Sequence, residues 1–368
     1  MNKFMTRILF VVLGLALAMS CVRRPLHDPS ELVTIRIKVD VKAVTNVNTN
    51  VRNCVELYGS NASLFDEKMG QLNPEMMRVL VYDPFSDRLL TQSFISSSTV
   101  DEEGYEVFEG TLGISHGRYN FLVYNFDTPT TQVTSETTES GILAFTDEIS
   151  PAMRAKYMGT RNDPQQPDPY ENVHIHYEPE HLMVANHRDV YIAPHDTLVV
   201  VKTEASTVVD TYYLQVRVEG LQFASSATAV ISGLSPSNHI GLNHRDNKPS
   251  SAVIFDLQKG RDLSLTGDNK DILCAVFNTF GKISESTSKL YITFNVYDTA
   301  GNLLQYTADM DTIFETELAI EKHWLIIDES YFHIVIPDPG VNPPTPQGDG
   351  GFQPRVDDWE EETGEIEI

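Results

Sequence analysis

The stretch from residue 33 to residue 41 reads Val-Thr-Ile-Arg-Ile-Lys-Val-Asp-Val. Every second residue is apolar, and the residues between them are polar or charged. Successive side chains of a β-strand point to opposite faces, so this alternation places all the apolar side chains on one face. The stretch therefore predicts a half-buried strand of an antiparallel sheet, with one face against a core and the other in water.

Similar strand patterns return along most of the chain. In the first half they predict strands at 77–82, 89–95, 105–112 and 118–126. In the second half they predict strands at 196–202, 212–220, 227–233, 252–256, 272–278, 290–297, 323–328 and 332–336. Turns separate these strands, and only 150–158 has a helical pattern, so we expect antiparallel sheets rather than βαβ units.

The strand pattern is weakest from about residue 127 to residue 189, where prolines at 164, 167 and 169 interrupt any regular element. We therefore predict an all-β protein with two antiparallel β-sandwiches in series and a domain change in this region. The predicted divisions are a signal segment at 1–20, an N-terminal sandwich with an irregular inter-domain segment at 21–180, a C-terminal sandwich at 181–337, and a Pro/Gly-rich linker with an acidic tail at 338–368.

The composition limits the partners. The chain has 52 acidic and 27 basic residues and a formal charge of −25. Binding to phosphate groups requires a basic surface, so this balance argues against a nucleic-acid partner. The same charge discourages nonspecific contact with anionic lipid. Attachment to a membrane therefore has to come from an anchor or from a protein partner.

The first twenty residues have the layout of a secretory signal. Lys3 and Arg7 precede an apolar run of about a dozen residues, which is shorter than the roughly 20 residues that a membrane-spanning helix needs. Ala18-Met19-Ser20-Cys21 resembles the sequence cut by lipoprotein signal peptidase. We predict cleavage before Cys21 and attachment of a lipid to Cys21. The alternative is an ordinary secretory signal that releases soluble protein.

Cys54 and Cys274 remain once Cys21 is assigned to the lipid. Cys274 lies in an apolar run that predicts a buried strand, where a free cysteine packs as a small hydrophobe. Cys54 lies in a polar stretch and is expected to be mobile. One long-range disulfide is an alternative, because disulfides persist outside the cytoplasm.

No stretch of the chain predicts catalysis. Gly113-Ile114-Ser115-His116-Gly117 has the spacing of a hydrolase nucleophile elbow, but that turn needs a helix after it, and a strand follows here. We interpret it as a turn between strands. His174 and His176 are spaced to share one face of a strand and Glu178 is near, but this irregular region favours solvated side chains over a metal site. We predict no catalytic residue, no metal site and no cofactor.

The C-terminal tail combines acidic and apolar residues. A proline-rich segment at 337–344 predicts a stiff, extended linker. The chain ends with Gly364, Glu365, Ile366, Glu367 and Ile368, in which the isoleucines alternate with glutamates. This segment is a candidate for addition to the sheet of another molecule. The alternative is a disordered acidic end that keeps the protein soluble.

Four features together resemble the fimbrillin-like lipoproteins of Bacteroidales, which include the Mfa2/FimB-type fimbrial anchor and tip subunits. The features are the lipobox with Arg23-Arg24-Pro25-Leu26 behind Cys21, the strand at 117–125, the strand at 212–220 followed by 230–234, and Asp357-Asp358-Trp359 near the end. The resemblance implies two transthyretin-like β-sandwich domains. It also implies a role in anchoring or regulating a fimbria, with subunits joined by addition of a β-strand.

These observations favour a non-enzymatic, lipid-anchored structural component of a fimbria, with fimbrial subunits as partners and adhesion as an associated role. The expected location is the outer membrane, attached through Cys21. Because Arg23 and Arg24 stand where surface-exported lipoproteins of these bacteria carry acidic residues, both the cell surface and the periplasmic face stay open. The alternative function is a surface glycan-binding lipoprotein of an outer-membrane import system.

Overall fold

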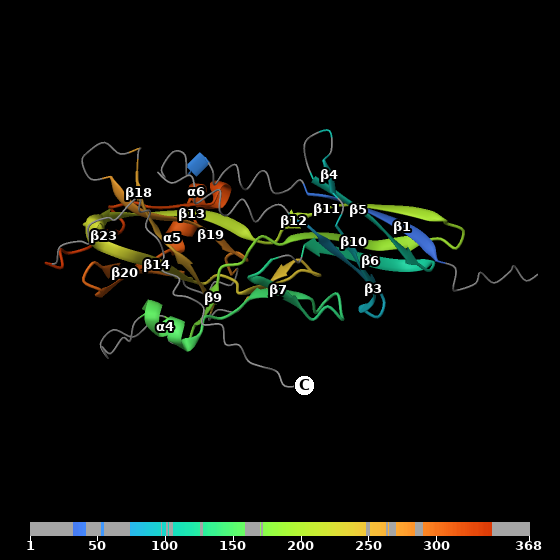
Figure 1. The fold of residues 1–368 in the computed structure, drawn as a ribbon, viewed down its shortest axis with the longest axis horizontal. Helices are drawn as coiled ribbons and strands as arrows, with labels where there is room; N and C mark the ends of the chain where they lie inside the picture. The colour runs from blue at the N-terminus through green and yellow to red at the C-terminus, as the bar shows by residue number, and fades with distance from the viewer. Residues whose placement is uncertain are drawn as a thin grey trace, which may run out of the picture.

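The computed structural model describes residues 32–41, 53–54, 74–96, 98–100, 102, 106–125, 128–158, 170, 172–247, 251–262, 264, 270–283 and 290–340. These residues form an elongated molecule in which two β-sandwiches lie end to end (Figure 1). Five sheets build the two halves, and we call them sheets A to E.

Sheets A and B form the first sandwich. Sheet A has the strand order β11-β1-β5-β4, and sheet B has the order β12-β10-β6-β2-β3. The strands of sheet A are β11 (Leu198–Glu204), β1 (Val33–Asp40), β5 (Glu106–Ile114) and β4 (Ser98–Val100). The strands of sheet B are β12 (Ser206–Thr207), β10 (Met183–Ile192), β6 (Gly117–Asn125), β2 (Met77–Asp83) and β3 (Arg88–Ile95).

The alternating stretch at residues 33–41 lies at the centre of the first sandwich. Val33, Ile35, Ile37 and Val39 of β1 are buried in one cluster with apolar side chains of β2, β6 and β10. The polar residues between these apolar ones face outward; they are Thr34, Arg36, Lys38 and Asp40. The core between sheets A and B therefore forms from the period-two pattern in the sequence, as predicted.

Sheets D and E form the second sandwich. Sheet D has the order β21-β20-β14-β17-β9, and sheet E has the order β18-β19-β13-β22, with β23 also paired to β13. The strands of sheet D are β21 (Leu303–Asp309), β20 (Tyr291–Asp298), β14 (Ala224–Ser232), β17 (Ser251–Asp256) and β9 (His174–Tyr177). The strands of sheet E are β18 (Gln258–Arg261), β19 (Asp271–Thr279), β13 (Asp210–Glu219), β22 (Trp324–Ile327) and β23 (His333–Val335).

The core of the second sandwich contains stacked aromatic rings. Phe255 of β17 and Phe277 of β19 stack with ring centroids 4.1 Å apart, and Tyr212 of β13 stacks on Phe277 at 5.8 Å. The connection to β22 folds into α5 (Asp311–Phe314) and α6 (Glu317–Lys322), and Phe314 packs against Tyr212. Thr316 accepts a hydrogen bond from the backbone N–H of Ala319 and so caps the start of α6.

Three of these four sheets are covered on both faces. The outer face of sheet B carries sheet C, a small sheet with the order β16-β15-β8-β7. Its strands are β16 (His244–Arg245), β15 (Ser237–His239), β8 (Leu143–Thr146) and β7 (Thr131–Thr134). The outer face of sheet D carries α4 (Pro151–Met158) and Tyr170, whose hydroxyl donates to the backbone oxygen of Val230 at 2.8 Å.

The outer face of sheet E is covered by α6 and by residues 53–54, so Tyr213 and Gln215 of β13 are buried. This differs from the sequence pattern, in which these residues form a polar face. Their polar groups are satisfied internally: Tyr213 donates to Gln215 at 3.0 Å, and Gln215 donates to Asp262 at 3.1 Å. Cys54 is likewise buried, and the expectation that it is mobile is wrong.

The boundary between the sandwiches lies later than the sequence analysis placed it. The predicted division falls between residues 180 and 181, but β10, β11 and β12 belong to sheets A and B. The first sandwich therefore continues to Thr207, and all the strands of the second except β9 follow from β13 at Asp210 onward. β10 was missed because polar residues interrupt its apolar pattern at Asn186–Asp189, where the strand also contains an irregularity in register.

The predicted all-β fold of two antiparallel β-sandwiches is confirmed, and its sheets also contain a few parallel strand pairs. β1 runs parallel to β11, β13 runs parallel to β22 and β23, and β17 runs parallel to β9. Parallel neighbours need long connections, and here these connections pass through other sheets. Alternation shows which face of a strand is buried but not which strand lies beside it.

The two halves also share strands. In sheet C, β8 from the inter-domain segment pairs with β15 from the second half of the chain, with Ser237 opposite Phe145. The following segment crosses to the second sandwich, where β9 extends sheet D beside β17. The region that the sequence suggests is irregular therefore joins the two sandwiches through backbone hydrogen bonds.

Gly220 provides a test of how β23 is held. Its φ is +75°, and a Cβ atom there would lie 2.1 Å from the backbone oxygen of Ile336. Gly301 has φ +83° but has nothing within 4 Å of a Cβ atom. We expect Gly220→Ala to lower the free energy of unfolding by more than about 2 kcal/mol, and Gly301→Ala by about 1 kcal/mol. Urea unfolding of both variants measures this, and equal losses would contradict a specific contact at Ile336.

Candidate functional site

The two sites predicted from the sequence, Cys21 and Gly364–Ile368, lie outside the described residues. The linker prediction at 338–368 also lies outside them beyond Gly340. No described helix is long and apolar enough to cross a membrane. The described body must therefore be searched for surfaces that receive a partner.

The Ser115 motif forms a turn, as predicted. β5 ends at Ile114 and β6 begins at Gly117, so Ser115 and His116 connect two antiparallel strands. The Tyr119 hydroxyl donates to the backbone oxygen of Ser115 at 3.0 Å and closes the turn. No helix follows Ser115, and the geometry of a nucleophile elbow is absent at this turn.

The histidines near residue 175 do not converge. His174 lies 3.0 Å from the carboxylate of Glu148, and His176 bonds the backbone oxygen of Thr146 at 3.0 Å. His181 is buried, and its Nε2 lies 3.0 Å from the Thr211 hydroxyl. Within the described part of the chain, no group of three or more histidine, cysteine, aspartate or glutamate side chains is placed to hold a metal ion.

Sheet edges are the other places where a partner can bind, because an edge strand leaves backbone N–H and C=O groups unpaired. The edge of β9 is covered, since Tyr177 donates to Asp147 at 3.1 Å and Ile149 donates to Ile175 at 2.9 Å. The start of β3 is covered by the bond from Leu89 to Thr137. Tyr331 reaches across the end of β21 to the backbone oxygen of Asp309.

β11, like β3, is one of the long edge strands. Among the described strands it pairs only with β1, over seven residues from Thr34–Leu198 to Asp40–Glu204. Val201 points into the core and is 3% exposed, whereas Leu198 and Val200 are 49% and 44% exposed. Edge strands of monomers usually carry charges that prevent pairing, and exposed apolar residues on an edge favour it.

The outer face of sheet A beside β11 carries charges of both signs. The register places Val200 beside Arg36, Lys202 beside Lys38, and Glu204 beside Asp40. Arg36 and Lys38 both contact Glu109 of β5, at 3.3 and 2.9 Å, and Lys38 lowers the pKa of that carboxyl. Lys202 is therefore the cation of β11 itself on this face, and no described ion pair neutralises it.

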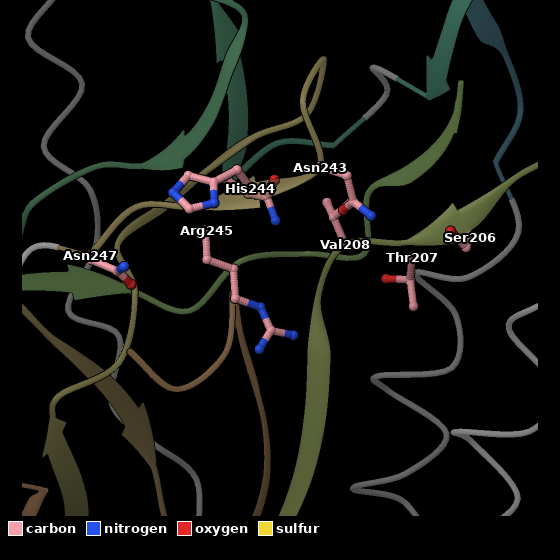
Figure 2. A pocket seen from close by; sticks show the side chains of 8 residues that line it. Ser206, Thr207, Val208, Asn243, His244, Arg245 and Asn247 are labelled. Carbon is pink, nitrogen blue, oxygen red and sulfur yellow. The ribbon is translucent and has the colours of Figure 1, made fainter. Parts of the chain in front are cut away.

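A cavity of about 440 Å³ lies at the junction of the two sandwiches (Figure 2). Figure 2 shows His244, Arg245 and Asn247 on one side and Ser206 and Thr207 on the other. The complete described lining is Ser206, Thr207, Val208, Asn238, Asn243, His244, Arg245 and Asn247.

The cavity is built for hydrogen bonding rather than for catalysis. Arg245 is neutralised by Asp210, with Nη2 2.7 Å from Oδ2. Asn238 is 3% exposed, and its Oδ1 has no hydrogen-bond partner. The described lining has no phenylalanine, tyrosine or tryptophan ring. The sequence analysis missed this cavity because β12 and β16 come together only through the fold.

Comparison with known proteins places the chain in a family. The family model described as a domain of unknown function, DUF5119, matches residues 64–256, a little more than half of the chain. The chain belongs to the DUF5119 family. This DUF5119 protein is also 23% identical over 379 residues to Fim4B of Bacteroides ovatus, described as a candidate fimbrium anchoring subunit, with 96% of each chain covered.

A solved structure from Bacteroides ovatus supports the fold of the DUF5119 protein. A crystal structure described as a candidate adhesin from Bacteroides ovatus covers 88% of this chain and 98% of its own, at 19% identity and a TM-score of 0.54. The fimbrial anchor protein Mfa2 from Porphyromonas gingivalis covers 79% of this chain and 87% of its own, at 12% identity and a TM-score of 0.42. The predicted resemblance to fimbrillin-like proteins is confirmed, on the full-length match to Fim4B.

The assignment of faces on β11 can be tested with two adjacent valines. We expect Val200→Lys to change the free energy of unfolding by less than about 0.5 kcal/mol, because the new ammonium stays in water. Val201→Lys should lower it by more than about 3 kcal/mol, because the charge enters the core between sheets A and B. Urea unfolding measures both, and a large loss in Val200→Lys would mean that this edge is not open.

Proposed function

We propose that this DUF5119 protein is a non-enzymatic, lipid-anchored component of a fimbria that anchors or regulates the fiber and joins other subunits by addition of a β-strand. The observation that carries the proposal is the match along 96% of both chains to a candidate fimbrium anchoring subunit. The partners are fimbrial subunits, and the location is the outer membrane, reached through the lipid on Cys21.

The described body supports a role in binding rather than in catalysis. Buried polar groups such as Gln215 and His181 are bonded to neighbouring protein groups and support the fold. The edge strand β11 carries exposed apolar side chains and lies beside an outer face with charges of both signs. These features suit a protein that acts by holding other proteins.

Strand addition requires a donor strand and an acceptor edge. The donor is the C-terminal segment Gly364–Ile368, carried on the proline-rich linker. The acceptor is the β11 edge, of this protein or of a related subunit. If Ile366 and Ile368 face the core side, Glu365 and Glu367 face Arg36, Lys38 and Lys202. Backbone pairing supplies affinity, and this alternation supplies register.

A five-residue strand is expected to bind weakly by itself. Burial of one isoleucine contributes about 1.5–3 kcal/mol, while ordering each residue of the segment costs about 1–2 kcal/mol. A linker that holds the segment near the edge raises its effective concentration. Assembly therefore depends on the linker as well as on the strand.

The lipid anchor is tested by detergent phase partitioning of the full chain made in its bacterial host. We expect wild-type protein in the detergent phase and Cys21→Ser in the aqueous phase, because the acyl chains supply the membrane affinity. Mass spectrometry of the N-terminal peptide of the mature protein should show acyl chains on Cys21. Partition of both proteins into the aqueous phase would contradict lipidation while leaving strand addition untouched.

The donor strand is tested by replacing Ile366 and Ile368 with serine in the anchored protein. We expect the fraction of fimbrial subunits that copurifies after cross-linking to fall at least tenfold, because the apolar face of the strand is lost. A matched control, Glu360→Gln with Glu361→Gln, changes the tail charge and keeps the terminal alternation.

The acceptor edge is tested in the same assay. Val200→Glu should reduce binding of the donor segment, because the new carboxylate repels Glu365 and Glu367, whereas Ile320→Glu, which changes an exposed apolar residue on α6, should not. Unchanged copurification in both the isoleucine variant and Val200→Glu would contradict strand addition.

The junction cavity favours one alternative, a surface lipoprotein that binds glycans for an outer-membrane importer. Its polar, nearly neutral lining and the unpartnered Oδ1 of Asn238 suit a saccharide hydroxyl. The described lining lacks the aromatic platform on which sugars commonly stack, so this alternative ranks second. Specific saccharide binding that is lost in Asn238→Ala would favour it over the fimbrial role.

A further inference from the structure

Two cysteines that are distant in the sequence meet in one buried cluster. Cys54 and Cys274 are each 0% exposed and are free thiols in the structure. They lie in a cluster with Tyr213, Ile272, Val276 and Trp324, on the outer face of sheet E. The sequence analysis left open whether these cysteines pair, and their common location bears directly on that question.

The cluster joins parts of the chain that belong to different sandwiches. Residues 53–54 lie on the connection between β1 and β2, which are both strands of the first sandwich. In Figure 1 this short blue segment lies beside α6, in the half of the molecule formed by sheets D and E. Cys274 is at the centre of β19, so a segment of the first sandwich is docked on the second.

The two described residues of this segment, Asn53 and Cys54, differ in burial. Asn53 is exposed, whereas Cys54 is completely buried. The surrounding sequence is rich in asparagine and threonine. The side chain that inserts into the apolar outer face of sheet E is therefore the Cys54 thiol. The chain has three cysteines. If Cys21 carries the lipid, which is part of the proposed function, Cys54 and Cys274 are the two that can pair.

We propose that Cys54 and Cys274 form a disulfide when the protein folds outside the cytoplasm. Two thiol S–H bonds are lost and one S–S bond is formed. The disulfide of a thiol-disulfide oxidoreductase takes up the two electrons and two protons and becomes a dithiol. The cross-link fastens the β1–β2 connection to sheet E, and with it one sandwich to the other.

The environment of the thiols determines when this step occurs. Burial raises the pKa of Cys274 to about 12 and raises the pKa of Cys54 as well, and Asp262 adds to the latter effect. The thiolate is the reacting form, so almost none is present in the folded protein at neutral pH. Exchange with an oxidant therefore takes place before the segment at residues 53–54 docks.

Peptide mapping tests the proposal on the full chain. The protein is taken from the bacterial envelope, quenched in acid, alkylated under denaturing conditions and digested with trypsin without reduction. Cleavage after Arg52, Lys68, Lys270 and Lys282 yields peptides 53–68 and 271–282. We expect one linked species that separates into these two peptides on reduction.

Recovery of both peptides with alkylated cysteines would overturn the proposal. The mapping also separates this failure from failure of the proposed function. An acylated Cys21 together with alkylated Cys54 and Cys274 would remove the disulfide alone. A link from Cys21 to either cysteine would overturn the disulfide and the lipid anchor together.

Refolding provides a second readout. The full-length Cys21→Ser variant, reduced and unfolded, should form the link when it refolds in an oxidising glutathione buffer, but not when the buffer is added to folded protein. Reduction of the linked protein should lower its Tm by roughly 10 °C, since a disulfide that closes a long loop stabilises most. Cys54→Ala and Cys274→Ala in the same background should show no such shift, and a linked protein with an unchanged Tm would contradict the stabilising role.

Discussion

The central constraint on this structure is that the central strands of sheets B, D and E are buried on both faces. A two-layer sandwich covers only the inner face of such a sheet. The outer face would remain in contact with water, so it needs a further covering layer. Sheet B is covered by sheet C, sheet D by α4 and Tyr170, and sheet E by α6 and Cys54. The covering segments come from elsewhere in the chain, and this exchange makes the two sandwiches into one interlocked body.

Sheet A is the exception, and its exposure determines where the protein can act. Its outer face has alternating polar residues such as Arg36 and Lys38, and its edge strand β11 has no second partner among the described strands. Elsewhere the described surface has polar cavities, including the one at the junction. In the proposed function, the exposed sheet A would be the face that receives a neighbouring subunit.

The strands with clear alternation could be predicted from the sequence because burial of one face leaves a periodic trace. β1 was found in this way. The neighbours of such strands could not be predicted, since the parallel pairing of β1 with β11 depends on a connection of more than 150 residues. The end of the first sandwich was placed too early because the polar centre of β10 hides a strand. Cys54 was misjudged because a single buried thiol leaves no pattern in a polar stretch.

The candidate sites also differ in whether a local sequence pattern reveals them. Cys21 and Gly364–Ile368 were predicted from local patterns and lie outside the described residues, so the fold neither adds to them nor changes them. The β11 edge and the junction cavity arise from tertiary structure and were not foreseen. The sequence does show an unbroken apolar run at 198–201, which includes Leu198 and Val200. Such a run is equally typical of a strand buried on both faces, so it does not reveal that these two side chains are exposed.

The position of β1 has a mechanical consequence. A tether at Cys21 would pull on the N-terminal end of β1, which is held along its full length by β11 on one side and β5 on the other. Force along the strand then acts in shear on both rows of hydrogen bonds at once, instead of opening them one at a time as in a zipper. Resistance to forced unfolding depends on the unfolding rate, and a strand clamped from two sides keeps that rate low under tension. The alternating stretch at residues 33–41 would in this way also serve as the point where a pulled fiber transmits its force to the membrane.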